Sequence, residues 1–270
     1  MQIDVVLEVE ADDSLIAIDF LVDNIELSKS RLKDMMNKGA VWHVDGKNHR
    51  RRLRRAMSDL AVGDRLEVFY DDELLAIRPP LPKLIADHVQ YSVWDKPPGL
   101  LSQGTDWGDH ASVLRLVELY FKPRRDVFLV HRLDREASGL IIIAHARKAA
   151  AQLSALFADG KAITKRYRVE VLGDAPESGE IETPIEGQAA RTRFAKVKYE
   201  PHPNRSTLDV WIETGRKHQI RRHMDSIGFP VMGDPRYGVG NKNNEGMRLK
   251  AVEISFDCPI TGEHQIFSAH

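Results

Sequence analysis

The chain has 270 residues, of which 42% are hydrophobic and 29% charged, and this composition excludes an intrinsically disordered protein. Its single cysteine, Cys258, excludes an intrachain disulfide and is typical of proteins from a reducing compartment. The longest apolar run, Leu140–Ala144, is too short to span a membrane, and the acidic N-terminus lacks the features of a signal peptide, so we expect a cytoplasmic protein.

The net charge of −1 conceals an uneven distribution of charge along the chain. Residues 1–27 carry eight acidic side chains and no Lys or Arg, whereas residues 28–65 carry eleven Lys and Arg against four Asp, a local balance of +7. Such a block predicts binding to the phosphates of a nucleic acid, and the alternative is a patch that only aids solubility. The side chains expected to bind are Lys29, Arg31, Lys33, Arg50, Arg51, Arg52, Arg54 and Arg55.

The first part of the chain has the pattern of a small α/β domain over residues 1–77. Apolar and acidic residues alternate over 3–9, which predicts a half-buried strand. Capping residues and apolar periodicity then predict two helices, the first capped by Ser14 and the second capped by Ser28 or Ser30 and ended by Gly39. Two strands are predicted after them, one over 41–44 before an Asp45-Gly46 turn and one over 66–70.

Three prolines in residues 78–83 favour a linker over 78–87, and a larger domain is expected over 88–270. Strands outnumber helices there and do not alternate with them, which favours an α+β domain with a mixed, mainly antiparallel sheet and flanking helices over a doubly wound fold. The expected strands are 88–94, 127–130, 140–144, 166–172, 193–200, 206–213, 249–256 and 264–268, and the expected helices are 112–121, 146–159 and 217–227.

The sequence HRLDREASGL, residues 131–140, places a polar turn between two apolar strands. A turn held by rigid strands can aim a side chain precisely, and Asp134 is the candidate for chemistry. The alternative is that Asp134 only caps the turn and pairs with Arg132 or Arg135.

Two further segments could contribute to a site. Residues 213–238 turn abruptly into a helix with His218, Arg221 and Arg222 on its polar side, which could bind phosphate or hold a carboxylate; the alternative is a solvated helix face. Tyr167, among three basic residues, either packs at a strand edge or stacks on a nucleobase.

Several enzyme classes lack their signatures here. The sequence contains no G-x-G-x-x-G, no G-x-x-x-x-G-K-[ST] and no G-x-S-x-G. Its histidines do not form H-E-x-x-H, so we expect neither a metal nor a cofactor. A glycosidase would need a second carboxylic acid, and Glu136 is too close to Asp134 in sequence to be a confident partner.

Two long segments in the same chain resemble a known enzyme family. HRLDREASG resembles the H-R-L-D-x-x-T-S-G motif of RluA-type RNA pseudouridine synthases, and TGRKHQIRRHMDSIGFPVMGDPRYG is similar to their second long motif. DKPPGLLS at 95–102, K-R-Y at 165–167 and RLKA…CPITGE at 248–263 also match, so the resemblance spans residues 88–268. The N-terminal part is similar, more weakly, to the small S-four RNA-binding domain. Ala137 departs from the family's usual Thr, and Lys250 and Cys258 from its common His.

The resemblance implies the pseudouridine synthase fold and the conversion of uridine in structured ribosomal or transfer RNA to pseudouridine by a monomer. Asp134 would act as nucleophile or as base, paired with Arg221 or, as second choice, Arg216. Tyr167 would stack on the uracil or also help to remove the C5 proton, Leu249 would pack on the base, and Arg132 would enter the space left by the flipped base. Further substrate contacts are expected from His131, Arg216, His218 and Gln219.

Two other functions stay open at this stage. One is a non-catalytic RNA-binding or ribosome-assembly factor on the same fold. The other is a nucleoside or glycoside hydrolase, which would release a free base.

Overall fold

The computed structural model describes residues 1–160 and 162–269, and the chain divides into two units. Unit 1 consists of Met1–Pro79 together with Gln103–Leu116, and unit 2 of Pro80–Ser102 and Val117–His270. The sequence predicted the whole of 88–270 as one domain, so the grouping of Gln103–Leu116 with unit 1 differs from that prediction. Its cause is a set of long-range ion pairs to arginines of unit 1, described below.

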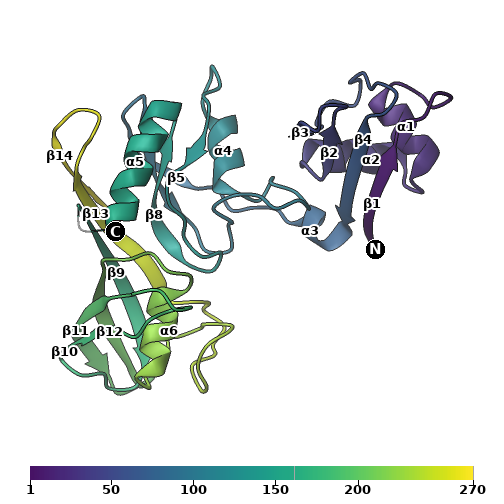
Figure 1. Ribbon diagram of the computed structural model, residues 1–270. Coiled ribbons are helices and arrows are strands. Elements are labelled where there is room, and N and C mark those ends of the chain that lie inside the picture. Colours follow the sequence, from purple (N-terminus) through teal and green to yellow (C-terminus); the bar gives the residue numbers. More distant parts are fainter. Residues whose placement is uncertain (161, 270) are drawn as a thin grey trace. The chain divides into compact units, whose positions relative to one another are not determined.

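Unit 1 is a four-stranded antiparallel sheet with helices that share its core (Figure 1). The core joins Phe20 and Leu21 of the first helix to Leu32, Met35 and Met36 of the second, all at most 1% exposed. The sheet order is β1-β4-β2-β3. The elements are β1 (Gln2–Glu8), α1 (Ala17–Asn24), α2 (Lys29–Asn37), β2 (Val41–Val44), β3 (Arg50–Arg52), β4 (Arg65–Asp71) and α3 (Asp72–Ala76).

The two predicted helix caps had different outcomes. Ser28 caps α2 by accepting a hydrogen bond from the Arg31 backbone N–H, which confirms one of the two predicted choices. The prediction for Ser14 is wrong: α1 starts at Ala17, and the Ser14 hydroxyl accepts from the backbone N–H of Ile16 instead. A local hydrogen bond of this kind competes with capping, and sequence spacing alone does not distinguish the two.

Unit 2 contains a ten-stranded sheet whose main path runs β10-β11-β12-β9-β13-β8-β6-β5. All its described pairings are antiparallel except β8 with β13, which confirms the predicted α+β class with a mixed, mainly antiparallel sheet. The elements are β5 (Lys83–Asp87), β6 (Tyr91–Lys96), α4 (Val113–Tyr120, whose first half belongs to unit 1), β7 (Phe128–Leu129), β8 (Ser138–Ala144), α5 (Arg147–Asp159), β9 (Ile163–Leu172), β10 (Ser178–Ile181), β11 (Thr192–Glu200), β12 (Arg205–Ile212), α6 (Gln219–Ser226), β13 (Leu249–Asp257) and β14 (His264–Ser268).

The predicted linker over residues 78–87 is partly wrong, because Lys83–Asp87 forms β5. Proline cannot donate a backbone hydrogen bond, which excludes it from central strands but not from the approach to an edge strand. β5 lies at the end of the strand order and starts after the last proline, Pro82. Only the proline-rich residues before it therefore lack regular structure.

The parallel contact between β8 and β13 depends on Gly139. A Cβ atom at this position would lie 2.1 Å from the carbonyl oxygen of Ala251, and the residue has a φ of +104°. Ala251 pairs with Gly139 on one side and with Tyr167 of β9 on the other. Residues of β8, β13 and β9 are thereby paired side by side across the sheet, directly after the turn that carries Asp134.

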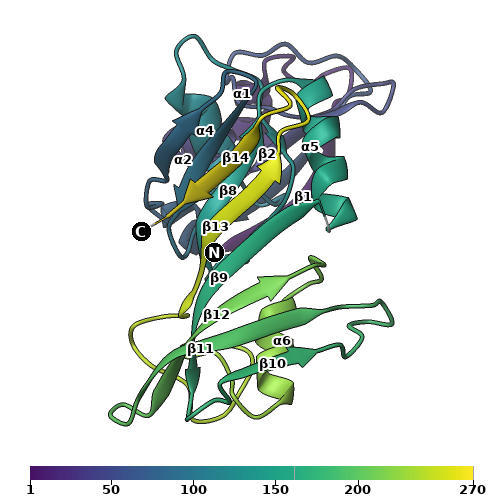
Figure 2. The same ribbon diagram turned by 90° about the vertical axis from the view of Figure 1, so that its left-hand side faces the viewer.

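The long strands β9 and β13 run through the middle of unit 2, with α5 towards one end of the sheet and α6 towards the other (Figure 2). Gly160 ends α5 in the left-handed conformation, with a φ of +69°, as its sequence position predicted. None of the described helices is long and apolar enough to cross a membrane.

We expect Gly139→Ala to lower the free energy of unfolding of unit 2 by about 3 kcal/mol or more. The added methyl group meets the backbone of β13, and an L-residue at this φ is strained. Urea unfolding followed by tryptophan fluorescence measures the change. Gly215→Ala is the matched control, since its Cβ would have nothing within 4 Å, and it should change stability by less than about 0.5 kcal/mol. Equal stability of the two variants would contradict the assigned role of Gly139.

Candidate active site

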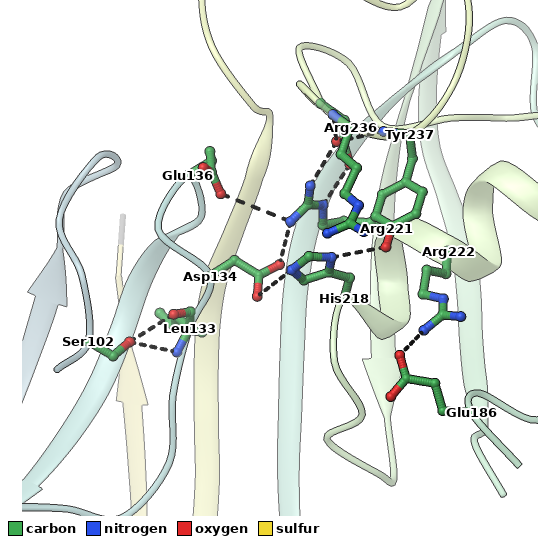
Figure 3. A network of polar contacts seen from close by, with 11 residues as sticks. Ser102, Leu133, Asp134, Glu136, Glu186, His218, Arg221, Arg222, Arg236 and Tyr237 are labelled. Carbon is green, nitrogen blue, oxygen red and sulfur yellow. Dashed lines mark hydrogen bonds and ion pairs between the residues drawn. The ribbon is translucent and has the colours of Figure 1, made fainter. Parts of the chain in front are cut away.

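Asp134 lies on the turn between β7 and β8, and this turn is fixed through its backbone (Figure 3). The Ser102 hydroxyl donates to the Leu133 carbonyl at 2.8 Å and accepts from the Leu133 N–H at 3.0 Å. The Ala137 N–H donates to the Asp134 carbonyl at 3.2 Å. Ser102 therefore fixes the backbone of Leu133, the residue before Asp134. This contact helps to set the direction of the Asp134 side chain before any ligand binds.

Lys96 stabilises the same turn through buried hydrogen bonds. Its fully buried ammonium donates to the carbonyl oxygens of Pro97, Leu100 and Arg135 at 2.8–3.1 Å. Burial lowers the pKa of Lys96 to about 8, although the charges of Glu136 and Asp134 oppose that change. One lysine thus ties the 97–100 loop to the turn that carries Asp134.

Arg221 of α6 binds two carboxylates that come from different segments. Its terminal NH1 donates to Asp134 Oδ2 at 2.9 Å, while Nε and NH2 donate to the two oxygens of Asp234 at 2.6 and 2.8 Å. Asp234 also accepts the backbone N–H groups of Arg236 and Tyr237. The predicted contact between Asp134 and Arg221 is present, and Asp234 holds the arginine in place for it.

The contacts between Arg221 and Asp234 favour the charged form of both groups. Burial alone lowers the pKa of Arg221, but the hydrogen bonds to Asp234 and Asp134 outweigh it and raise the pKa above the ordinary value. Burial likewise raises the pKa of Asp234, and the bonds from Arg221 and two backbone N–H groups outweigh it and lower the pKa. Arg221 is therefore a permanent cation beside Asp134.

A pocket of 80 Å³ opens in front of Asp134. Small-molecule sites usually start at roughly 300 Å³, so this pocket can enclose part of a nucleotide but no length of strand. Burial, with the Asp134 charge, raises the pKa of Tyr167, so its phenol stays protonated at neutral pH. The predicted site residues that line the pocket are Arg132, Asp134, Tyr167, Arg216, His218, Gln219, Arg221 and Leu249, with Ala137 in the wall.

His218 stands beside Asp134 as a neutral side chain. Its Nε2 lies 3.9 Å from Asp134 Oδ1, and its Nδ1 is 3.0 Å from the Tyr237 hydroxyl. Burial lowers the pKa of His218, opposed by the charge of Asp134. Arg221 is thus the cation that hydrogen-bonds to Asp134, and Asp134 Oδ1 accepts no hydrogen bond from the described residues.

His131 does not line this pocket, although it was predicted to contact the substrate. Its Nε2 accepts the Ile142 backbone N–H at 3.0 Å, and its ring stacks on Phe157 with 4.0 Å between centroids. Burial and the nearby Lys165 lower the pKa of His131 to about 3. A neutral ring whose acceptor nitrogen bonds to β8 anchors the turn instead.

Gln219 lines the pocket but uses its amide to build the turn before α6. Its oxygen accepts from the Thr214 hydroxyl and the Arg216 N–H, and its nitrogen donates to the Arg191 carbonyl and the Thr192 hydroxyl. All its polar atoms are occupied by protein groups, so its position favours a supporting role. Arg216, the second choice for the Asp134 partner, donates through Nε to the Ala189 carbonyl.

Three of the five arginines at residues 50–55 in unit 1 are paired with carboxylates. Arg50 binds Asp106 at 2.9 Å, and Arg54 and Arg52 both reach Asp109, the latter at 3.3 Å. Both aspartates belong to Gln103–Leu116, which explains why this segment groups with unit 1. These three arginines could meet phosphates only by giving up carboxylate partners, so the prediction that the whole arginine run binds RNA has less support at these positions.

The other five residues predicted to bind RNA fall into two groups. Lys29 pairs with Asp19, and Arg31 donates to the Tyr70 hydroxyl. The second group is exposed and makes no ion pair with any described residue: Lys33, Arg51 and Arg55. We call these three residues the free basic set.

The sequence reasoning gave no role to Asp234, Lys96 or Ser102. Asp234 lies in the GDPRYG part of the second motif, whose many glycines and prolines indicated a constrained loop without naming the carboxylate. Lys96 and Ser102 lie in DKPPGLLS, where only the resemblance marked the segment. Across the described residues no group of three or more His, Cys, Asp or Glu is arranged to hold a metal ion.

Comparisons with known proteins agree with one another. A family model described as RNA pseudouridylate synthase matches residues 90–226. The chain is 33% identical over 166 residues to ribosomal large subunit pseudouridine synthase D of Zymomonas mobilis, covering 52% of this chain and 51% of that protein, so it spans about half the length of this relative. It is 30% identical over 215 residues to dual-specificity RNA pseudouridine synthase RluA of Vibrio vulnificus, covering 71% and 77%. The solved structure of human RNA pseudouridylate synthase domain containing 1 shares the fold, with a TM-score of 0.60 at 19% identity over 72% of this chain and 86% of that one.

We expect Asp234→Asn to lower the free energy of unfolding by about 3 kcal/mol at pH 7, because Arg221 would lose a buried partner. The pKa of Asp234 is lowered by folding, so its stabilisation is complete above about pH 4 and is lost as the pH falls further. Urea unfolding at pH 7 and pH 3 should therefore show a difference from the wild type that shrinks in acid. Asp257→Asn, at a side chain 84% exposed, is the control and should change little at either pH.

Proposed function

Because this chain belongs to the RNA pseudouridylate synthase family, we propose that it converts specific uridines in structured ribosomal or transfer RNA to pseudouridine. The observation that carries the proposal is the environment of the Asp134 side chain. One of its oxygens is held by a buried arginine, and the other faces a pocket walled by Tyr167 and Leu249. An aligned carboxylate in a pocket that can enclose only part of a nucleotide suits chemistry on a single flipped residue.

The reaction is an isomerisation. The bond from C1′ of the ribose to N1 of uracil breaks, the uracil turns, and C5 forms a bond to C1′ while its proton moves to N1. Asp134 acts either as the nucleophile at the sugar or as the base that starts an elimination, and both roles require an ionised carboxylate. Arg221 provides for that state by remaining charged at 2.9 Å from Asp134.

Tyr167 and Leu249 hold the uracil. Both line the pocket, Leu249 as a buried apolar side chain and Tyr167 as a half-buried ring. A phenol with a raised pKa is a poor base at neutral pH. Its position therefore supports stacking on the base more than removal of the C5 proton.

The target uridine has to leave the base stack of the RNA to reach Asp134, and this unstacking costs a free energy of roughly a few kcal/mol. Arg132 is exposed and lies at the pocket, two residues before Asp134. We propose that the Arg132 side chain fills the space that the flipped base leaves in the RNA.

Unit 1 is proposed to be an S-four-like domain that adds affinity for RNA through phosphates. The free basic set, Lys33, Arg51 and Arg55, supplies the contacts, because the other three arginines of residues 50–55 already have carboxylate partners. We further propose that the protein acts as a monomer in the cytoplasm.

A non-catalytic RNA-binding factor is the second candidate. A protein that only bound RNA would not need a carboxylate aligned by Arg221 and Asp234, so the intact network favours the enzyme. Release of tritium from RNA labelled at uridine C5 separates the two, and release of free uracil would instead indicate a hydrolase.

We expect Asp134→Asn to abolish pseudouridine formation and to leave RNA affinity within a small factor. Asn has nearly the same shape but is neither a nucleophile nor a base at neutral pH. Tritium release measures the reaction, and a filter-binding titration measures affinity. Asp257→Asn makes the same chemical change at a side chain that is 84% exposed and lies outside the Asp134 pocket, and it should keep the activity. Substantial turnover by Asp134→Asn would move the chemistry to another residue.

A second expectation concerns the free basic set. Changing Lys33, Arg51 and Arg55 to Gln should weaken RNA binding and reduce the slope of log K against log salt by roughly 0.7–0.9 for each lost phosphate contact. The matched triple change of Arg50, Arg52 and Arg54 to Gln should mainly lower the thermal stability of unit 1, because it breaks partly buried ion pairs. An unchanged salt slope in the first variant would exclude the free basic set from RNA binding.

A further inference from the structure

A second pocket adjoins the one that holds Asp134. It has a volume of 280 Å³ and shares Ile212 as a common wall residue with the Asp134 pocket. Lys165 lies two positions before Tyr167 on β9, so both side chains project from the same face of that strand. The two pockets are therefore neighbours along one side of β9.

Lys165 lines this second pocket and is only 6% exposed. Its ammonium has neither a hydrogen bond nor an ion pair to any described residue, in contrast to Lys96, which has three carbonyl partners. Burial lowers the pKa of Lys165, which is the sign of a charge without compensation. A buried amine without a partner is unfavourable, and a bound anion would provide the missing partner.

The rest of the pocket also fits an anion with an apolar part. Arg193 is exposed and makes no ion pair with a described residue, whereas Arg191 is held by Glu180, Glu182 and Glu213. Three cations and one carboxylate, Glu213, thus line the pocket, together with the half-buried ring of Trp211. Aromatic rings and basic groups together are the usual surface for a nucleic acid strand.

We propose that this pocket binds a phosphodiester of the RNA strand directly beside the flipped uridine, with Lys165 as its anchor and Trp211 against the adjoining sugar or base. The inference rests on the proposed function, since it places the reacting uridine in the Asp134 pocket. A strand with its uridine there has to pass the shared wall at Ile212. The phosphate anchor would thereby fix the strand on one side of the reacting nucleotide.

The proposal predicts opposite effects on stability and on binding. Lys165→Met removes an uncompensated buried charge, so it should raise the melting temperature. The same change should weaken binding of a short RNA hairpin with one loop uridine by about tenfold or more, because a charge-assisted hydrogen bond is lost. Lys165→Arg should keep much of the affinity. Lys148→Met, at an exposed position on α5, is the charge-matched control and should alter neither quantity.

The decisive measurement combines Lys165→Met with hairpins that carry one neutral methylphosphonate at each position around the uridine. If Lys165 contacts a phosphodiester, one of these hairpins should bind the wild type about tenfold more weakly and bind Lys165→Met no more weakly than the unmodified RNA. Equal losses for both proteins at every position would overturn the proposal. So would a Lys165→Met variant that binds as well as the wild type or is less stable.

Two controls separate the remaining explanations. If inorganic phosphate raises the melting temperature of the wild type but no methylphosphonate position couples to Lys165, the pocket takes a free anion and the proposal is wrong. Pseudouridine formation is measured separately with the unmodified hairpin and with total ribosomal and transfer RNA. Coupling without any product would refute the proposed function while leaving the phosphate contact in place.

Discussion

The geometry of the active site depends on how Arg221 is shared between two carboxylates. Asp234 is fully buried and takes two of the guanidinium hydrogen bonds, which leaves NH1 directed at Asp134. The same Asp234 accepts the backbone N–H of Tyr237, whose hydroxyl meets His218. A buried ion pair thus orients Arg221, and through it the carboxylate of Asp134.

Periodic patterns predicted most of unit 2 because its strands are long and regularly buried. The Asp134 and Arg221 contact could be expected from the two motifs, since a carboxylate that stays ionised in a partly dry pocket needs a cation. β5 was missed because the prolines before it are typical of a linker. A motif also does not reveal which polar atoms the protein itself occupies, as it does those of His131 and Gln219.

The same limit explains the arginines of unit 1. A run of basic residues shows how much charge is present, but its partners can lie some fifty residues away, as Asp106 does from Arg50. The net charge is close to zero because 39 Lys and Arg are balanced by 40 Asp and Glu, and this total does not show which cations are paired. Basic side chains that make no ion pair with a described residue, such as Arg51, Arg55 and the buried Lys165, are more informative than the total, because their charge is available to an anion.

The chain passes between the two units three times, because Gln103–Leu116 returns to unit 1 after unit 2 has begun. An N-terminal domain attached by one peptide can be gained or exchanged by joining two genes at a single point. Unit 1 cannot be replaced in that way, since Asp106 and Asp109, which complete its surface, are encoded within the catalytic half. A transplanted unit 1 would therefore have to carry residues 103–116 along with the N-terminal segment.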